Sequence, residues 1–217
     1  MAWNNSLWVA VFAANLSQRW RGVCLNLTPQ QMLDRTGAYL ANLEKAKRGY
    51  VAVGLPSEEV GGKVYGNGMT VISIGAIHEF GSTFMHPGGT PYVVSGGKAR
   101  FVSKSFVGPV SGITKPHSIT IPRRSFLRIP FNSKKDDLEK ATVKQFQDVF
   151  ERGKSAEQAL GLIGTVAVNI SKGAFTTRGY GEWPDITAGT KKAKGSGQTM
   201  IDTGTLRNSI TYVVRGL

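Results

Sequence analysis

Apolar residues recur every three or four positions in two long stretches, and this spacing predicts two amphipathic helices. The first begins at Thr28 and Pro29, an N-cap residue followed by a proline at the first helical position, and ends before Gly49. The second is expected to start at a cap on Ser133 and to reach about Phe150. Each helix should bury its apolar side against a shared core.

A third predicted helix is apolar on more than one side. Ser155 and Gln158 have the spacing of a capping box at its start. Its expected buried positions are Ala159, Leu162, Ile163, Val166, Ile170 and Ala174. Because a helix that is apolar nearly all round is usually surrounded by protein, we expect this one at the centre of the core.

Strand-like patterns appear at residues 50–54, 69–77 and 210–215, where apolar β-formers follow one another or alternate with small residues. Between them, residues 56–68 and 176–199 are rich in glycine and are expected to be loops. Asp202 should then cap a short helix that ends at Asn208.

Two strand-like runs between Pro91 and Val102 are separated by Gly96-Gly97. Glycine adopts the positive φ that a two-residue hairpin turn requires, so this pattern predicts a β-hairpin. We expect a long protruding β-arm, inserted in the domain at about residues 82–118.

These elements predict an α+β fold, with helices packed on a small, mainly antiparallel sheet. At 217 residues, the chain fits one domain at 29–217, preceded by a hydrophobic extension at 1–28. The extension should pack on protein, because Arg19 and Arg21 alone would be a meagre basic face for a membrane-surface helix. No uninterrupted apolar run has the length of a membrane span, so we expect no membrane partner.

Charge is distributed unevenly along the chain. The 27 basic and 14 acidic residues give a net charge of +13. No acidic residue lies between Phe80 and Pro130, which contain Lys98, Arg100, Lys104, Lys115, Arg123, Arg124 and Arg128. Residues 50–79 have the opposite balance, with three acidic residues and one basic residue. The basic segment could serve solubility alone or form a contact surface.

Groups suited to catalysis are sparse. His78-Glu79 lacks the second histidine of a zinc-binding helix, because Ser82 stands at that position, and a site from His78, His86 and His117 would need distant loops to converge. Cys24 is the only cysteine, which excludes an intramolecular disulfide, and we expect it to be a small buried residue. No nucleophile elbow or phosphate-binding loop is present. We therefore expect no catalytic residue, metal or cofactor.

Nucleic-acid binding is the main alternative, because aromatic residues accompany the basic ones in the arm. Tyr92, Phe101 and Phe106 could stack on bases, although a hairpin also needs such residues for its own packing. No helix-turn-helix, zinc finger or RNA-binding sheet motif accompanies them.

Four motifs occur in one order along the chain: His78-Glu79-Phe80-Gly81, Ile121 to Arg128 (IPRRSFLR), Trp183-Pro184 with Thr187 and Thr190-Lys191-Lys192, and Ile201 to Ile210 (IDTGTLRNSI). Together they resemble the tail completion and virion morphogenesis proteins of tailed bacteriophages, over roughly residues 29–215. The resemblance implies a non-enzymatic protein of the virion neck, made in the host cytoplasm. Its copies would form a ring, usually six-fold, that ends the tail and docks on the head.

The resemblance also implies partners: other copies of the chain, the tail tube protein, a head-side connector or portal-adaptor protein, a sheath protein if the tail contracts, and DNA passing through the channel. Independently, Ser125 is expected to cap a turn holding Phe126 and Leu127, with Arg123, Arg124 and Arg128 left available outside. Leu206 is expected to fill the core and Arg207 to point outward. The residues expected to contact a subunit or partner are Tyr92, Val94, Lys98, Arg100, Phe101, Arg123, Arg124, Arg128, Lys191, Lys192 and Arg207.

Overall fold

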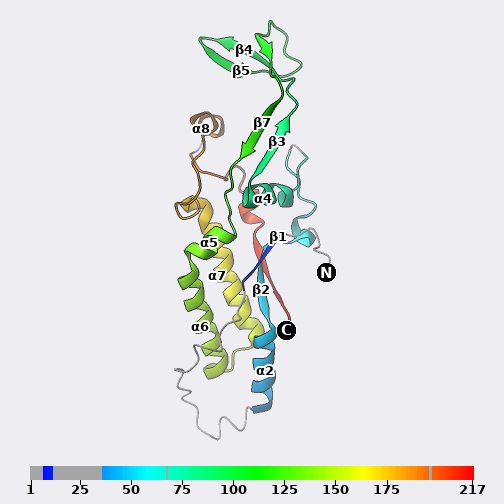
Figure 1. Cartoon of the computed structure of the whole chain (residues 1–217). Coiled ribbons are helices and arrows are strands. Elements are labelled where there is room, and N and C mark those ends of the chain that lie inside the picture. Colours follow the sequence, from blue (N-terminus) through cyan, green and yellow to red (C-terminus); the bar gives the residue numbers. More distant parts are fainter. Residues whose placement is uncertain (1–6, 12–35, 67, 196) are drawn as a thin grey trace.

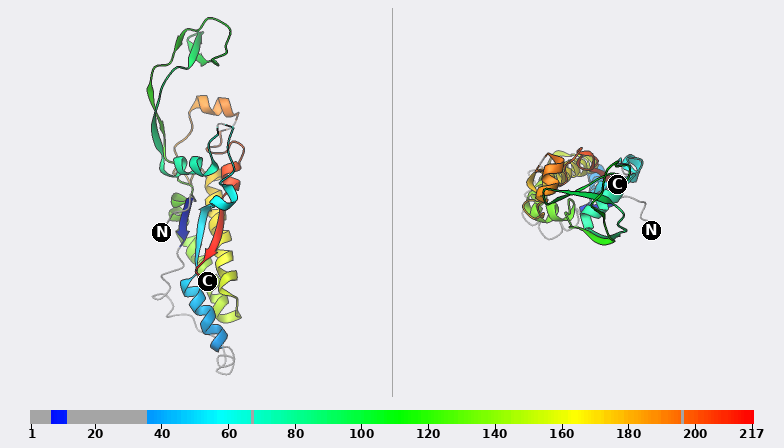
Figure 2. Two further views of the ribbon diagram at one scale, coloured as in Figure 1. Left: turned by 90° about the vertical axis from the view of Figure 1, so that its right-hand side faces the viewer. Right: turned by 90° about the horizontal axis from the view of Figure 1, so that it is seen from above.

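The computed structural model describes residues 7–11, 36–66, 68–195 and 197–217. The molecule is elongated, with a helical end, a sheet at mid-height and a second group of strands at the far end (Figures 1 and 2). Its elements are β1 (Leu7–Val11), α2 (Thr36–Arg48), β2 (Tyr50–Leu55), α3 (Ser57–Val60), α4 (Val71–Phe80), β3 (Ser82–His86), β4 (Pro91–Ser95), β5 (Lys98–Phe101), β6 (Gly112–Ile113), β7 (His117–Ile121), α5 (Arg128–Ser133), α6 (Lys135–Arg152), α7 (Ala156–Thr177), α8 (Ala188–Lys194), α9 (Thr205–Asn208) and β8 (Thr211–Arg215).

The central sheet has the strand order β1-β2-β8 and is antiparallel throughout. Val51 and Val53 of β2 lie opposite Val214 and Tyr212 of β8, so these four side chains share one face of the sheet. α7 packs against both strands. The strands predicted around residues 50–54 and 210–215 are confirmed, as is the α+β class.

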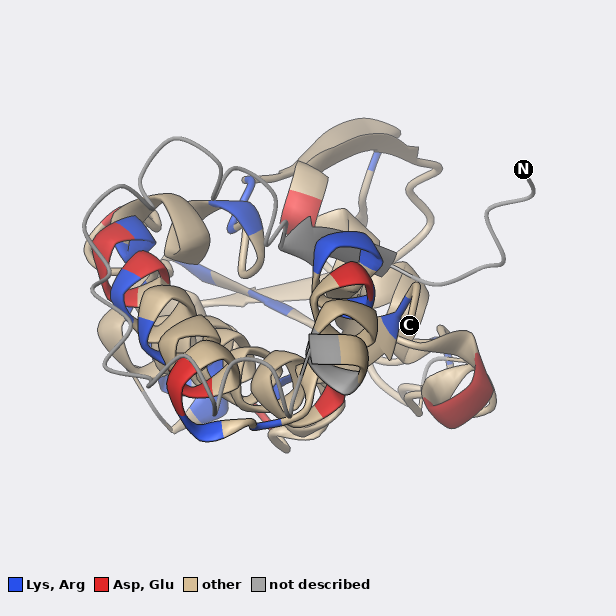
Figure 3. Ribbon diagram, turned by 90° about the horizontal axis from the view of Figure 1, so that it is seen from below, with Lys and Arg blue, Asp and Glu red and all other residues tan. Residues whose placement is uncertain are grey.

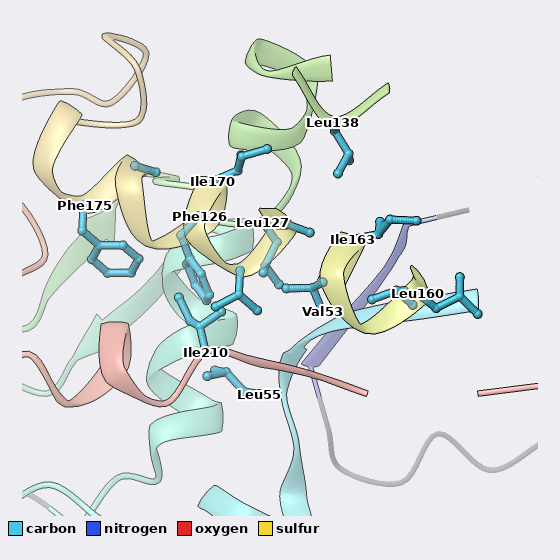
Figure 4. Close-up of a cluster of buried hydrophobic side chains, with 14 of the residues drawn as sticks. Val53, Leu55, Phe126, Leu127, Leu138, Leu160, Ile163, Ile170, Phe175 and Ile210 are labelled. Atoms are coloured by element: carbon cyan, nitrogen blue, oxygen red, sulfur yellow. The ribbon is translucent and has the colours of Figure 1, made fainter. Parts of the chain in front are cut away.

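α7 is the central helix of the core, as predicted. Its capping box is present, with Ser155 accepting from the Gln158 backbone and Gln158 accepting from the Ser155 backbone. Leu160, Ile163, Ile170 and Phe175 of α7 lie among core side chains from β2, α6 and the segment before α5 (Figure 4). By length and composition, α7 could cross a membrane, but 56% of its apolar window is buried inside the protein, as in a core helix. The expected burial of Leu162 is wrong, because its side chain is 46% exposed.

Two small antiparallel sheets lie beyond the body. β3 and β7 pair into a two-stranded ribbon, called here the ribbon, and β5-β4-β6 form the distal sheet at its far end (Figure 1). β4 and β5 are joined by the predicted turn, with Gly96 and Gly97 at φ 57° and 73°. The segment is therefore more elaborate than one long hairpin. We call residues 81–123 the distal segment.

The strand predicted at residues 69–77 is wrong, because Val71–Phe80 form the helix α4. Thr70 caps this helix by accepting a hydrogen bond from the Ser73 backbone N–H. Val71, Gly75 and Glu79 are its buried residues, and their spacing of four places them on one helical face. Alternating β-branched residues looked like a strand, but the cap and this spacing favour a helix.

Four loop and cap predictions are also corrected. α3 interrupts the loop expected at 56–68, and α8 interrupts the one expected at 176–199, where Thr187 accepts a hydrogen bond from the Thr190 backbone. Ser133 ends α5 and does not cap α6, whose N-cap is Lys134. Gly204, at φ 77°, replaces Asp202 as the N-cap of α9.

The first helix is present as α2 and ends at Arg48, next to the predicted stop. Its expected start at Thr28 and Pro29 lies outside the described residues, as do Cys24 and most of the hydrophobic extension. Within that extension, Leu7–Val11 form β1 and pair with β2. Part of the extension therefore belongs to the central sheet of the domain.

Candidate functional site

The distal segment has no buried core of its own. No residue from 81 to 123 is buried in the single chain. The segment also contains eight of the thirteen large hydrophobic residues that are exposed in the described structure: Phe84, Met85, Val94, Phe101, Phe106, Val107, Val110 and Ile113. Exposed apolar surface of this extent indicates an interaction site.

The distal segment also differs from the body in the sign of its exposed charges. Lys98, Arg100, Lys104, Lys115 and Arg123 are exposed there, and no acidic residue accompanies them. At the opposite end of the molecule, basic and acidic residues alternate along the helices (Figure 3). Exposed charge of a single sign is therefore concentrated at the far end.

The distal sheet has two chemically different faces. Tyr92 lies opposite Phe101, and Val94 opposite Ala99, so these side chains form one apolar face. On the other face Arg100 lies opposite Val93, and Lys98 opposite Ser95. We call these the apolar face and the basic face. Phe101 is 68% exposed, so no residue in the described part of the chain covers the apolar face at that position.

The ribbon that carries the distal sheet has little support along its length. Phe84 lies opposite Ile119 on one face, and on the other Thr83 and Thr120 join their hydroxyl groups at 3.1 Å. An isolated two-stranded ribbon is only marginally stable in water. Its position must therefore be fixed where it joins the body.

Glu79 fixes that junction, which we call the root. Its buried carboxylate accepts hydrogen bonds from the Ser125 hydroxyl at 2.6 Å and from the backbone N–H groups of Phe126 and Leu127 at 2.9 and 3.0 Å. Arg128 adds its backbone N–H and its Nε, both at 3.3 Å. Glu79 is the last residue but one of α4, just before β3, and its partners follow β7. One side chain therefore connects the segments that flank the two strands of the ribbon.

Other buried contacts complete the root. The Ser125 hydroxyl accepts hydrogen bonds from the backbone N–H groups of Arg128 and Ile129, the first two residues of α5, at 3.1 and 3.2 Å. The N-cap residue of α5 is nevertheless Leu127. The Trp183 indole donates to the Ser125 carbonyl at 2.9 Å, and the Ser171 hydroxyl donates to the Phe126 carbonyl at 2.6 Å. Elements far apart in the sequence thus converge on the four residues after Arg124.

Gly81 forms the turn between α4 and β3. Its φ is 75°, and a Cβ there would lie 3.2 Å from the backbone nitrogen of Arg123. The Arg124 backbone donates to the His78 carbonyl at 2.8 Å, which closes the same turn. Burial, together with the nearby cations Arg124 and Lys194, lowers the pKa of His78 from 6.5 to about 4.

The structure brings together five of the predicted interface residues. Tyr92, Val94, Lys98, Arg100 and Phe101 all lie on the distal sheet, and all but the half-buried Tyr92 are exposed. Their role in an interface remains a prediction.

The other six residues lie elsewhere and differ in exposure. Arg123 and Lys192 are exposed, whereas Lys191 forms an ion pair with Asp185 at 2.6 Å. Arg128 pairs with Glu79 and lies over the Phe80 ring at 4.9 Å.

Arg124 and Arg207 are predicted to point outward, and the structure shows that neither is exposed. Arg124 is buried and donates to the carbonyl oxygens of Pro184 and Asp185 at 3.1 and 3.4 Å. Arg207 is half-buried, with a buried Nε that has no partner among the described residues. Sequence reasoning also missed Glu79, whose role depends on a contact with residues more than forty positions away.

The histidines do not form a three-ligand site. His86 and His117 face each other across the ribbon with ring centroids 5.0 Å apart, while His78 lies on α4 at the root. Within the described residues, no group of three or more His, Cys, Asp or Glu side chains could hold a metal ion.

No family model matches the chain, and no curated protein or solved structure is significantly similar to it. Inference about its function therefore starts from its own residues.

Proposed function

We propose that this protein is a structural component of the neck of a tailed-phage virion. In this role its copies form a ring at the head-proximal end of the tail, complete the tail and join it to the head connector. The observation that carries the proposal is the distal segment, which contains no buried residue, is apolar in part and free of acidic residues, and is held out by a buried root. A segment built in this way is suited to binding another protein.

The four motifs that resemble tail completion proteins supply further support, because they serve the fold near the root. Glu79 of the first motif binds residues 125–128 of the second, and Trp183 of the third binds Ser125. In the fourth, Leu206 packs near Gly75 of α4, 3.4 Å from the site of a Cβ. A shared set of fold-forming contacts is what a structural protein family would be expected to retain.

A ring imposes a definite requirement on each subunit. Closed rings arise from head-to-tail contacts, so each copy must offer two different complementary surfaces. The proposed partners are other copies of the chain, the tail tube protein, a head-side connector and, in a contractile tail, the sheath. The distal segment supplies one of the two surfaces.

Nucleic-acid binding is the second candidate, and the basic face of the distal sheet favours it. Lys98 and Arg100 lie side by side on neighbouring positions of that face. Binding through phosphates should weaken linearly in log affinity against log salt. Self-association through apolar surface should show a much smaller salt dependence.

The direct test is electron microscopy of a lysate from the phage carrying this gene, with the gene interrupted. The proposal predicts DNA-filled heads and separate tails, with tails overlong or without a proper end. Complementation from a plasmid should restore joined particles, which controls for effects on neighbouring genes. Normal joined virions in the absence of the protein would overturn the proposal.

A further inference from the structure

The stretch around α3 has an unusual charge for this chain. Residues 50–79 contain Glu58, Glu59 and Glu79 with Lys63 as the one basic residue. Glu79 is buried in the root, which leaves Glu58 and Glu59 as the acidic surface of this stretch. Both are exposed, and neither carboxylate forms a hydrogen bond or an ion pair with a described residue.

Exposed apolar surface accompanies this charge. Val64 follows α3 in the same loop and is 63% exposed. We call residues 57–64 the acidic loop. It therefore combines unpaired negative charge with an uncovered apolar side chain, and the basic face of the distal sheet combines Lys98 and Arg100 with the half-buried Val93.

The two surfaces are complementary, whereas two copies of the distal segment are not. Lys98 and Arg100 on the basic face would repel the same residues of another distal segment, because no acidic residue lies among residues 81–123. A surface that carries free glutamates beside an apolar side chain removes that repulsion. The acidic loop has this character within the described chain.

Within one copy the two surfaces are far apart along the long axis. α3 lies level with the central sheet, whereas the distal sheet lies at the far end of the ribbon (Figures 1 and 2). The root holds both ends of the ribbon, so the distal sheet projects away from its own body. Contact between the two surfaces therefore requires a second copy.

We propose that the distal sheet of one copy binds the acidic loop of the next copy, with Lys98 and Arg100 facing Glu58 and Glu59. This inference rests on the proposed function and names the contact that builds its ring. Because the two surfaces differ, the contact is head-to-tail, and repetition with the correct rotation closes a ring.

Charge reversal tests the pairing in the purified full-length protein. One variant carries Glu58→Lys with Glu59→Lys, so that its two surfaces are both positive; the other carries Lys98→Glu with Arg100→Glu, so that both are negative. For each variant alone, we expect self-association to be at least tenfold weaker than that of the unmodified protein. An equimolar mixture should recover assembly, with the two variants alternating, because every contact then joins opposite charges.

Mass photometry and size-exclusion chromatography with light scattering would measure these species at low and physiological salt. Glu151→Lys with Glu182→Lys is the matched control, since both glutamates are exposed elsewhere on the body. It should assemble like the unmodified protein. Unchanged thermal unfolding would show that each reversed variant is folded.

Three results would overturn the inference. The first is assembly of the unmodified protein that neither reversal weakens, which would leave the proposed ring intact but built by another contact. The second is a mixture that fails to assemble when both reversed variants are folded. The third is an unmodified protein that stays monomeric at every protein and salt concentration. In that case, loss of DNA binding by the Lys98→Glu, Arg100→Glu variant would favour nucleic-acid binding as the function of the basic face. The neck role itself is judged separately by the gene-interruption experiment.

Discussion

The carboxylate of Glu79 accepts five hydrogen bonds from the segment that begins at Ser125. Backbone N–H groups supply three of the five, so their position depends on the path of the chain more than on side-chain identity. A buried carboxylate is stable only when its lost hydration is replaced in this way. Glu79 is therefore the residue on which the geometry of the root depends most.

Glu79→Gln should lower the free energy of unfolding by about 2–4 kcal/mol, because the amide loses the negative charge and turns an NH₂ group toward N–H donors. Urea denaturation would measure the change. Glu182→Gln is the matched control, since Glu182 is exposed and a surface change of this kind usually stays within about 0.5 kcal/mol. Equal stability of the two variants would show that the root does not depend on this carboxylate.

His78 should make stability depend on pH. Its pKa is lowered from 6.5 to about 4 in the folded protein, so between these values the unfolded chain binds a proton that the folded chain does not. The stability that neutral His78 contributes is fully present above pH 6.5 and is lost as the pH falls toward about 4. The loss should reach roughly 2–3 kcal/mol.

Comparison with His78→Gln isolates this effect, because glutamine is uncharged at every pH while all carboxylates remain. As the pH falls from 6.5 to about 4, the urea midpoint of the unmodified protein should fall more than that of the His78→Gln variant. A difference that is constant with pH would mean that His78 titrates normally.

At the scale of elements, the packing of α7 on β8 depends on a glycine. A Cβ on Gly164 would come too close to three ring carbons of Tyr212, whereas a Cβ on Gly161 would meet only the Tyr212 hydroxyl at 3.5 Å, an ordinary contact. Both glycines lie inside the same helix. They therefore separate the effect of packing from that of helix propensity.

Gly164→Ala should destabilise the protein by about 1–3 kcal/mol, because β8 must shift to accommodate the methyl group. Gly161→Ala should stabilise it by up to about 1 kcal/mol, because alanine favours the helix. Thermal and urea unfolding of both variants would give the comparison. Stabilisation by both would mean that Tyr212 moves aside freely.

Elements with strong local signals could be predicted from the sequence. The capping box of α7, the strands β2 and β8 and the Gly96-Gly97 turn each depend on residues close together in the chain. α4 was mistaken for a strand because MTVISIGAI satisfies both periodicities, and the Glu79 contact that decides the matter lies with Ser125. Arg124 was expected outside for a similar reason, since its carbonyl partner Pro184 is sixty residues away.

For the whole molecule, burial divides the chain into a body that folds around α7 and a distal segment that contributes no buried residue. Stability and assembly should therefore respond to different changes. We expect contacts within the body to determine the free energy of unfolding, and the exposed surfaces of the distal segment and the acidic loop to determine self-association.

Deletion of residues 91–102 tests this division. The urea midpoint should change little, because none of these side chains is buried in the single chain. Self-association, and incorporation into virions, should be lost. Chromatography, circular dichroism and virion assays would report the three properties, and a deleted protein that fails to fold would place the distal sheet in the core.

The root also has an evolutionary consequence. Three of its contacts to Glu79 are made by main-chain N–H groups, which every residue but proline possesses, and the other ends of the network lie in α4, α5 and α7. The junction specifies where the distal segment leaves and re-enters the body, and apart from the glycine that the turn at Gly81 requires, it constrains little of the sequence between. Recombination at these two points can replace the whole insertion with an unrelated one, so that binding specificity diverges while the scaffold stays the same.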